Sequence, residues 1–459
     1  MKFSRRDVRK KAHAIPKLKF ENNHSQTLTS FAGLVVFQSF FLAIDLKTKL
    51  GQCFRQMKNG KVFDRATIFL QLVVHLLLGY RELQESRHYQ DDPLVKRVLG
   101  LARLPDVATL SRMLKEATQQ SVEKLRALLE TMVLQRVQSL ALPRITLDFD
   151  GSVQSTRRHA EGTAVGFNKK KKGARSYYPL FCTLAQTGQV LNFLHRPGNV
   201  HDSNGARAFI LQCVDAIRRV APQAVIEVRM DSAFFSDEIV MALDGRGVEF
   251  SISVPFERFC ELKRLVEERT WWWHLKGPAW YFESKWKPDC WKKRFRFMFV
   301  RTRTKKQQKG PIQLDLFEPH EYGYEYKVIV TNKTVQTKTV VAFHEGRGSQ
   351  ENVFAELKTH CHMDYIPVRT RYGNQTYLLA GLFAHNLTRE LQMRTTEPSR
   401  TTTAKRATLW VFEKLDTLRK TVLQRAGRLT RPGGTLTLTV SGGSWLKKRI
   451  LQTLAATTQ

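Results

Sequence analysis

Apolar residues recur at three- and four-residue steps through most of the first 142 residues, which is the spacing of amphipathic helices. Two runs are almost continuously apolar: FAGLVVFQSFFLAI, which begins at Phe31, and IFLQLVVHLLLGY, which begins at Ile68. Both are too short to span a bilayer, and both contain Gln or His, so we predict buried helices and no membrane segment. Residues 1–142 are therefore expected to form a helical N-terminal domain.

One segment of this helical part fits two structures. The sequence LPDVATLSRMLKE, which begins at Leu104, could belong to a DNA-reading helix-turn-helix, and a plain helical bundle explains it equally well. The pattern leaves both alternatives open.

From Pro143 the apolar pattern changes to period two, which is typical of strands. The runs RITLDFDGSV, YYPLFCTL and QVLNFL predict three strands, and Thr187-Gly188 marks a hairpin turn between the last two. A helix is then expected over residues 202–220, followed by the strand AVIEVRMD, the helix SDEIVMALDGRG and the strand VEFSISV. Residues 143–256 are therefore predicted to form an α/β sheet with helices packed on it.

Residues 257–340 are rich in Trp and Lys and alternate in polarity, as in KKRFRFMFVRTRT and YEYKVIVTN, which predicts a β-rich insertion. A polar stretch, TKKQQKG, runs through it. Residues 341–392 return to a helical pattern that continues to about Gln424. The C-terminal region, residues 393–459, is expected to be helical and then Gly-rich.

The charge of the chain points to its partner. Its 75 Lys and Arg residues against 41 Asp and Glu residues give a net charge of +34, spread along the whole length. Such a field attracts polyanions, and nucleic acid is the first candidate. The six cysteines are scattered, with no C-x-x-C pair and no secretory leader, which predicts reduced thiols in a cytoplasmic protein and argues against a zinc site.

Acidic residues end two of the predicted strands. Asp148 and Asp150 end ITLDFD, and Asp231 ends AVIEVRMD. In an α/β sheet such residues can converge on one edge, and acids that end apolar strands are costly to place unless they are solvated or liganded. The alternative is that each Asp only caps a turn or a helix, as Asp often does.

The segment HEGRGSQENVFAELK, which begins at His344, mixes acids and bases. On a helix Arg347, Glu351 and Lys358 fall within about 40° of one another, and His344 shares that face if the helix extends so far. The segment is either a solvated helix whose charges pair, or a site in which a carboxylate holds a metal and the bases hold an anion.

The spacing Arg347-x3-Glu351-x6-Lys358 resembles a signature of bacterial insertion-sequence transposases of the DDE superfamily. In that signature a Tyr usually stands where this chain has His344. Further stretches similar to the same group are LDFDGSV, GFNKKKKGARSYYPL, RPGNVHDSNGA and RMDSAFF, so the resemblance covers roughly residues 140–390.

The resemblance implies a ribonuclease H-like α/β core, interrupted by the β-rich insertion, in which Asp150, Asp231 and Glu351 hold two Mg²⁺ or Mn²⁺ ions. Asp148 is the competitor for the first position because it shares a strand face with Asp150. Arg347 and Lys358 are then expected to grip phosphates near the cut, with His344 beside them.

The implied function is a DNA transposase that binds the terminal inverted repeats of its element as a homodimer, cleaves the DNA and joins its 3′ ends to target DNA. The alternatives are a catalytically inactive DNA-binding descendant and a ribonuclease H-like nuclease. We expect a cytoplasmic, nucleoid-associated protein.

Two further clusters are candidate DNA contacts. We expect the lysine run Lys169, Lys170, Lys171 and Lys172 to contact the DNA backbone, although such runs are usually solvated loops. Trp272, in the triplet WWW, could stack on DNA bases, although a Trp triplet is more often core packing.

The stretch QLDLF resembles the peptide motif by which bacterial replication and repair proteins bind the sliding clamp. The residues that carry it are Gln313, Leu314, Leu316 and Phe317. A short edge strand of the insertion, with both leucines facing inward, explains the stretch about equally well.

Overall fold

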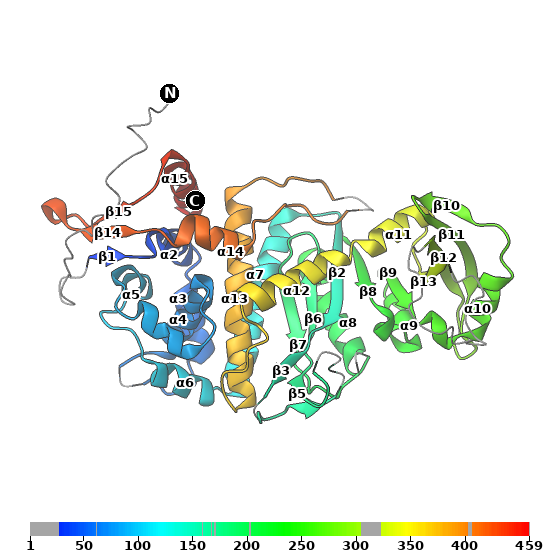
Figure 1. Ribbon diagram of the computed structural model, residues 1–459, viewed down its shortest axis with the longest axis horizontal. Helices are drawn as coiled ribbons and strands as arrows, with labels where there is room; N and C mark the ends of the chain where they lie inside the picture. Colours follow the sequence, from blue (N-terminus) through cyan, green and yellow to red (C-terminus); the bar gives the residue numbers. More distant parts are fainter. Residues whose placement is uncertain are drawn as a thin grey trace, which may run out of the picture.

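The computed structural model describes residues 27–458 apart from 61, 158, 167, 169–170, 202, 304–322 and 403–405. Figure 1 shows an elongated molecule in which the N-terminal helices lie at one end, the long helix α13 (Arg371–Thr395) stands next to them, and a large sheet extends to the other end. Both ends of the described chain lie on the helical side. The fold is therefore mixed α/β, with α13 between its helical and sheet parts.

The N-terminal part consists of helices, as the apolar spacing predicts. They are α2 (Val35–Ala43), α3 (Leu46–Phe54), α4 (Arg65–Leu78), α5 (Pro93–Leu99), α6 (Val107–Lys115) and α7 (Gln119–Leu140), together with the 3₁₀ segments η2 (Ala32–Leu34) and η3 (Leu83–Tyr89). Polar caps set several of their starts, since the side chains of Asp64, Asp106 and Thr118 accept hydrogen bonds from the first turns of α4, α6 and α7. Gly79 and Gly100 end α4 and α5 in the left-handed conformation.

The second apolar run forms α4, which is buried from Ala66 to Leu78, so the predicted buried helix is confirmed. Among the described residues no single helix has the length and apolar composition needed to cross a membrane. Helices α4 and η3 pass that test only when joined, and they meet at an angle of 79°.

In the described part of the chain, nine strands form one sheet in the order β10-β11-β12-β13-β9-β8-β2-β6-β7. Their bounds are β2 (Arg144–Gly151), β6 (Leu180–Leu184), β7 (Val190–Leu194), β8 (Val225–Met230), β9 (Glu249–Val254), β10 (Trp273–Lys276), β11 (Ala279–Trp286), β12 (Phe295–Arg303) and β13 (Tyr324–Thr331). Strands β2, β8 and β9 are parallel neighbours, and the other pairs are antiparallel. A separate small sheet holds β3 (Gln154–Thr156), β4 (Ala164–Val165) and β5 (Arg175–Tyr177).

Strand alternation gives the sheet two apolar faces. On β6, the side chains of Leu180, Cys182 and Leu184 belong to one hydrophobic core. The helices α8 (Ala206–Val220), α9 (Asp237–Gly245) and α10 (Cys260–Glu267) contribute to the same core. Phe181, between Leu180 and Cys182, joins the opposite core with α12 (Gly348–His360), α13 and the N-terminal helices. Through this second core, which reaches from the sheet to the N-terminal helices, α12 packs across the sheet (Figure 1).

Residues 257–340 contain the expected strands β10–β13, but these do not form a separate all-β body. Strand β13 pairs with β9 from Val328↔Val254 to Thr331↔Ser251, so β10–β13 extend the central sheet. The segment also contains α10, and it is followed by α11 (Thr337–Glu345). The period-two pattern identifies strands, but which strand edge they join depends on contacts distant in sequence.

The C-terminal region also departs from its predicted helical pattern. No helix is present between residues 396 and 414 in the part that the structure describes. The chain then forms α14 (Leu415–Leu418), the π-helix η6 (Arg419–Leu423), β14 (Gly427–Thr430), the 3₁₀ turn η7 (Pro432–Gly434), β15 (Thr437–Val440) and α15 (Ser444–Thr458). Strand β14 pairs with β1 (Leu28–Thr29), and the Ser39 and Thr457 hydroxyls are hydrogen-bonded at 2.8 Å, so the first and last described segments pack together.

Candidate active site at the sheet edge

Two of the predicted acids lie at the same end of neighbouring parallel strands. Asp150 is the seventh residue of β2, and Asp231 directly follows β8. The strands pair with Asp148 opposite Arg229, and the same register continued by two residues aligns Asp150 with Asp231. Asp231 also caps the 3₁₀ turn η4 (Ser232–Phe234), since its Oδ1 accepts a hydrogen bond of 3.0 Å from the Ala233 amide. Asp231 therefore caps a turn and also lies at the same sheet edge as Asp150.

The third acid is joined to the first by an arginine. Arg347, which precedes α12, places Nη1 at 3.2 Å from Asp150 Oδ2 and Nη2 at 3.8 Å from Glu351 Oε1. The Glu351 side chain is 67% exposed, so it projects from α12 into solvent. The prediction that Arg347 and Glu351 share a helix flank is confirmed by this i,i+4 pair. Lys358 lies two turns further along α12 and is half-buried.

A guanidinium therefore lies where a metal would bring carboxylates together. Within the residues that the structure describes, no three His, Cys, Asp or Glu side chains lie close enough to hold a metal ion. Arg347 instead provides the positive charge between Asp150 and Glu351. The arrangement concentrates partly exposed carboxylates and one guanidinium at the sheet edge.

Asp148 has a different environment from Asp150, although both stand on one face of β2. Asp148 is buried, and Arg229 Nε and Nη2 donate to its two carboxylate oxygens at 2.6 and 2.7 Å. Burial raises the pKa of Asp148, and the guanidinium of Arg229 opposes that shift. A carboxylate engaged in this way has no free lone pairs directed to solvent, which favours Asp150 as the first acid.

Arg229 also fixes the junction between α11 and α12. Its Nη1 donates to the Phe343 carbonyl at 3.0 Å, and its guanidinium lies 5.1 Å from the centre of the Phe343 ring. A Cβ on Gly346 would come within 2.3 Å of that Nη1, so this glycine permits the close approach. Gln350 adds a third tie, since its Nε2 donates to the Asp148 carbonyl at 2.9 Å. The buried pair thus holds β2 and the start of α12 in register.

The side chain of His344 is buried and does not share a surface with Arg347, which corrects the prediction that it faces DNA. Helix α11 ends at Glu345 and α12 begins at Gly348, so the two residues belong to different helices. The ring of His344 is buried and hydrogen-bonded to the hydroxyls of Ser251 (3.0 Å) and Ser253 (2.9 Å) on β9. Burial, followed by the charges of Lys327, Arg347 and Arg229, holds its pKa well below the usual value. It is a neutral core residue.

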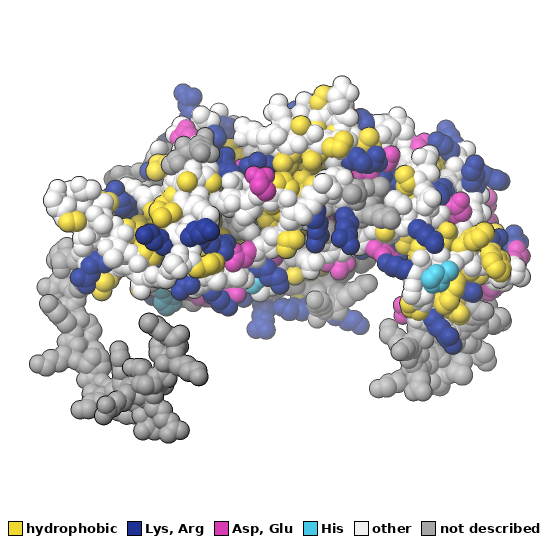
Figure 2. Space-filling view, turned by 90° about the horizontal axis from the view of Figure 1, so that it is seen from above, with side chains coloured by type: hydrophobic (Ala, Val, Ile, Leu, Met, Phe, Trp, Pro, Cys, Tyr) yellow, Lys and Arg dark blue, Asp and Glu magenta, His cyan; other side chains and the backbone are white. Residues whose placement is uncertain are grey.

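Trp272 is likewise a core residue, which corrects its prediction as a stacking platform. It is 7% exposed, its ring lies edge-on to Phe282 at 4.6 Å, and the Arg301 guanidinium lies 4.5 Å from its centre. Its neighbours Trp271 and Trp273 are 64% and 55% exposed. Because successive side chains of extended backbone point to opposite sides, the outer pair was the better candidate. In Figure 2 apolar side chains gather on the surface beside a histidine at the end of the molecule that carries β10.

The remaining predicted contacts are only partly described. Lys171 and Lys172 are exposed in the loop between β4 and β5, where the Lys171 amide donates to Asn168 Oδ1 at 3.1 Å, while Lys169 and Lys170 lie outside the described residues. The clamp-like stretch Gln313, Leu314, Leu316 and Phe317 also lies outside them.

At the other end of the sheet, the acids are neutralised inside the fold. Glu227 on β8 is buried, accepting hydrogen bonds of 2.9 Å from both Arg144 and Thr146, and Lys333 pairs with the same carboxylate. At the Asp150 edge the carboxylates stay partly exposed, with the Asp150 side chain 22% and the Glu351 side chain 67% exposed. This contrast within one sheet distinguishes structural carboxylates from those that solutes can reach.

The sequence matches a known protein family. The family described as "Transposase DDE domain group 1" matches residues 16–459. Among solved structures, a piggyBac transposase synaptic complex with hairpin DNA is 10% identical, with a TM-score of 0.39, covering 85% of this chain and 80% of that chain. A Mos1 transposase paired-end complex with the left transposon end is 12% identical, with a TM-score of 0.17, covering 42% of this chain and 61% of that chain. A Mos1 mariner paired-end complex with Mn is also 12% identical, with a TM-score of 0.17, covering 44% and 65%. No curated protein matches.

Proposed function

The chain belongs to the transposase DDE domain group 1 family, and we propose that it is a DNA transposase acting through Asp150, Asp231 and Glu351. It binds the terminal inverted repeats of its element, cleaves phosphodiester bonds there and joins the 3′ ends to target DNA. One observation carries the proposal: Asp150 and Asp231 share a sheet edge, and Arg347 joins Asp150 to Glu351.

The donor set at this edge fits Mg²⁺ or Mn²⁺, of which we propose two ions. Carboxylate oxygens are the hard ligands that these cations prefer. A cationic group already lies between two of the acids, with Arg347 at 3.2 Å from Asp150 and 3.8 Å from Glu351, so positive charge is favourable there. When bound, two such ions activate the attacking hydroxyl or water and stabilise the leaving oxygen.

Arg347 has two successive tasks in this proposal. While it pairs with Asp150, it neutralises the acids. Once it leaves Asp150, that carboxylate can ligate a metal, and the planar guanidinium can hold a phosphate next to the cut with two parallel hydrogen bonds. Lys358, further along the same helix, and the run Lys169–Lys172 are proposed to hold the backbone of double-stranded DNA.

The proposed layout follows the function. Residues 1–142 form the DNA-binding domain, 143–256 and 341–392 form a ribonuclease H-like core, 257–340 form the insertion, and 393–459 form the C-terminal region. The parallel strands β2, β8 and β9 with α12 packed across them support such a core. We further propose a homodimer on DNA and docking of Gln313–Phe317 to a sliding clamp, which a pull-down with a Leu316→Ala, Phe317→Ala variant tests.

The decisive experiment is metal-dependent cleavage of a labelled duplex that carries the inverted repeat. The intact protein should nick this DNA with Mg²⁺ or Mn²⁺ and join its 3′ ends to a plasmid. Asp150→Asn, Asp231→Asn and Glu351→Gln should each abolish nicking while binding of the repeat persists, because phosphate contacts by Lys and Arg supply most of the affinity.

The same experiment separates the alternatives. Repeat binding without nicking by the intact protein would indicate a catalytically inactive descendant. Nicking without joining would indicate a ribonuclease H-like nuclease. Normal nicking by all three variants would refute the assignment of the acids.

A further inference from the structure

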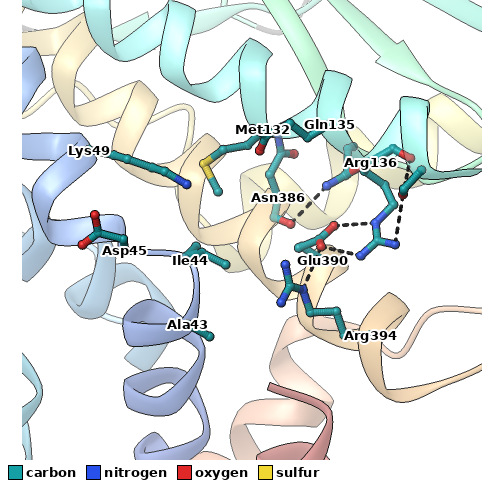
Figure 3. Close-up of a pocket in the computed structure, with 12 residues that line it drawn as sticks. Ala43, Ile44, Asp45, Lys49, Met132, Gln135, Arg136, Asn386, Glu390 and Arg394 are labelled. Atoms are coloured by element: carbon teal, nitrogen blue, oxygen red, sulfur yellow. Dashed lines mark hydrogen bonds and ion pairs between the residues drawn. The ribbon is translucent and has the colours of Figure 1, made fainter. Parts of the chain in front are cut away.

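A basic cavity lies toward the end of strands β2 and β6 that is opposite to the proposed active site. It has a volume of about 530 Å³ and is lined by the junction of α2 and α3, by α7 and by the last turns of α13, with Gln189 from the β6–β7 turn (Figure 3). On β2, Leu147 pairs with Leu184 next to that turn, whereas Asp150 pairs with Phe181 at the far end of β6. The cavity is therefore separate from the acids, and its volume falls in the range of about 300–1,000 Å³ of small-ligand sites.

Two arginines in this cavity share one carboxylate. Arg136 donates from Nε and Nη2 to the two oxygens of Glu390, at 2.9 and 2.5 Å. Arg394, one turn along α13 from Glu390, donates from Nε to Oε1 at 3.0 Å. Figure 3 shows Glu390 between the two guanidinium groups. One positive charge of this largely buried cluster therefore stays uncompensated.

Lys49 adds a second uncompensated charge. In Figure 3 its side chain extends from α3 into the cavity, with the ammonium group toward Met132 and Asn386, while the carboxylate of Asp45 points away from the cavity. Three cations and one carboxylate thus face the same space, an excess of two positive charges. If Asp45 at the rim is counted as well, one positive charge remains. Half-buried cations are costly unless an anion accompanies them.

We propose that this cavity binds a phosphomonoester group. Such a group carries about −1.5 to −2 charge at pH 7, close to the excess of one to two positive charges, and it offers three acceptor oxygens where a carboxylate offers two. Its oxygens suit the free guanidinium N–H groups of Arg136 and Arg394, with Lys49 as a point charge. Ala43, Ile44 and Met132 provide an apolar wall for whatever is esterified to it. The group comes from a 5′-phosphorylated DNA end, or from inorganic phosphate or a nucleoside monophosphate.

Ligand binding at this place would also stiffen the molecule. The lining residues come from the junction of α2 and α3 on one side and from α7 and α13 on the other. A phosphate that contacts Lys49 together with Arg394 therefore links the two sides and should raise the melting temperature. The change in melting temperature does not depend on catalysis, so it tests the cavity independently of the proposed catalytic acids.

The test compares the full-length protein with Lys49→Gln and Arg394→Gln, and with Lys47→Gln as the matched control, because Lys47 lies on the same helix but is exposed to solvent. The first arm measures melting temperature in inorganic phosphate against chloride at equal ionic strength. The intact protein and Lys47→Gln should be stabilised by phosphate, and the two cavity variants should lose that stabilisation.

The second arm measures binding of one duplex with a 5′-phosphate or a 5′-hydroxyl end. A preference for the phosphorylated end that Lys49→Gln abolishes identifies DNA as the source, and equal binding of both ends together with stabilisation by phosphate identifies a small ligand. Absence of both effects in the intact protein, or equal losses in Lys47→Gln and Lys49→Gln, overturns the proposal.

Discussion

Asp148 and Asp150 show how two residues on one strand face acquire different tasks. Asp148 is closed off from solvent by a two-point contact with Arg229, whereas Asp150 reaches the sheet edge and meets a partly exposed Arg347. A buried charge that loses its partner is expensive, while an exposed pair contributes little. The two substitutions to Asn should therefore separate stability from activity.

We expect Asp148→Asn to lower the free energy of unfolding by about 3–5 kcal/mol, because it leaves the Arg229 charge buried without its carboxylate. Asp150→Asn should change that free energy by less than about 1 kcal/mol, because it weakens only a partly exposed pair, and it should abolish nicking. Urea unfolding and repeat nicking on the same preparations check both. A stable, inactive Asp148→Asn beside an active Asp150→Asn would reverse the assignment.

At the scale of elements, the break between α11 and α12 orients α12, the helix that carries the proposed acid Glu351. Gly346 lies at this break with an ordinary helical φ of −59°, so its role is space and not backbone freedom. A Cβ there would displace Arg229 Nη1, which donates to the Phe343 carbonyl while Asp148 holds Nε and Nη2 of the same buried guanidinium. The Cβ would also lie 3.0 Å from that carbonyl oxygen. The neighbouring elements must therefore shift to admit a methyl group.

Gly346→Ala should cost about 1–3 kcal/mol of stability, as overpacking of a closed site does. It should also reduce nicking more than repeat binding, because the shift moves Arg347 and Glu351 relative to Asp150. The matched control is Gly348→Ala, two residues on, where an added Cβ meets nothing within 4 Å. That variant should be neutral or more stable by up to about 1 kcal/mol, since Ala favours helix more than Gly does. Equal effects of both would contradict a specific role of the junction.

At the scale of the whole molecule, a net charge of +34 attracts polyanions in general. Only those Lys and Arg side chains that contact phosphates would fix the position of a bound DNA. Lys and Arg side chains are spread over the face in Figure 2, with acids between them. Salt dependence can separate bases that contact phosphate from bases that only add to the field, since each contacted phosphate contributes about −0.9 to the slope of log affinity against log salt concentration.

Replacing both Lys171 and Lys172 by Gln should make that slope for repeat binding shallower by about 1.8, if each lysine contacts one phosphate. Fluorescence anisotropy at several salt concentrations measures it. Lys447→Gln with Lys448→Gln is the control, because it removes the same charge from exposed positions on α15. An equal change of slope in the two double variants would mean that the loop only contributes to the general field.

Much of the fold and part of the site could be predicted from local pattern. The buried helix α4, the strands β2, β6, β7, β8 and β9 with α8 and α9 between them, and the helix flank of Arg347 and Glu351 all follow from short-range periodicity. The acids that end β2 and β8 were also visible, because a carboxylate after an apolar run interrupts the pattern at one position. These features depend on residues close together in the chain, so the sequence by itself determined them.

The tertiary structure decided which of those residues are buried and what they meet. Whether Asp148 or Asp150 reaches the edge depended on Arg229, whether His344 faces outward depended on β9, and whether β10–β13 stand alone depended on the free edge of that same strand. The cavity around Glu390 likewise needs α3, α7 and α13, whose lining residues range from Lys49 to Arg394. Burial and ion pairing are set by contacts distant in sequence, and periodicity carries no information about such contacts.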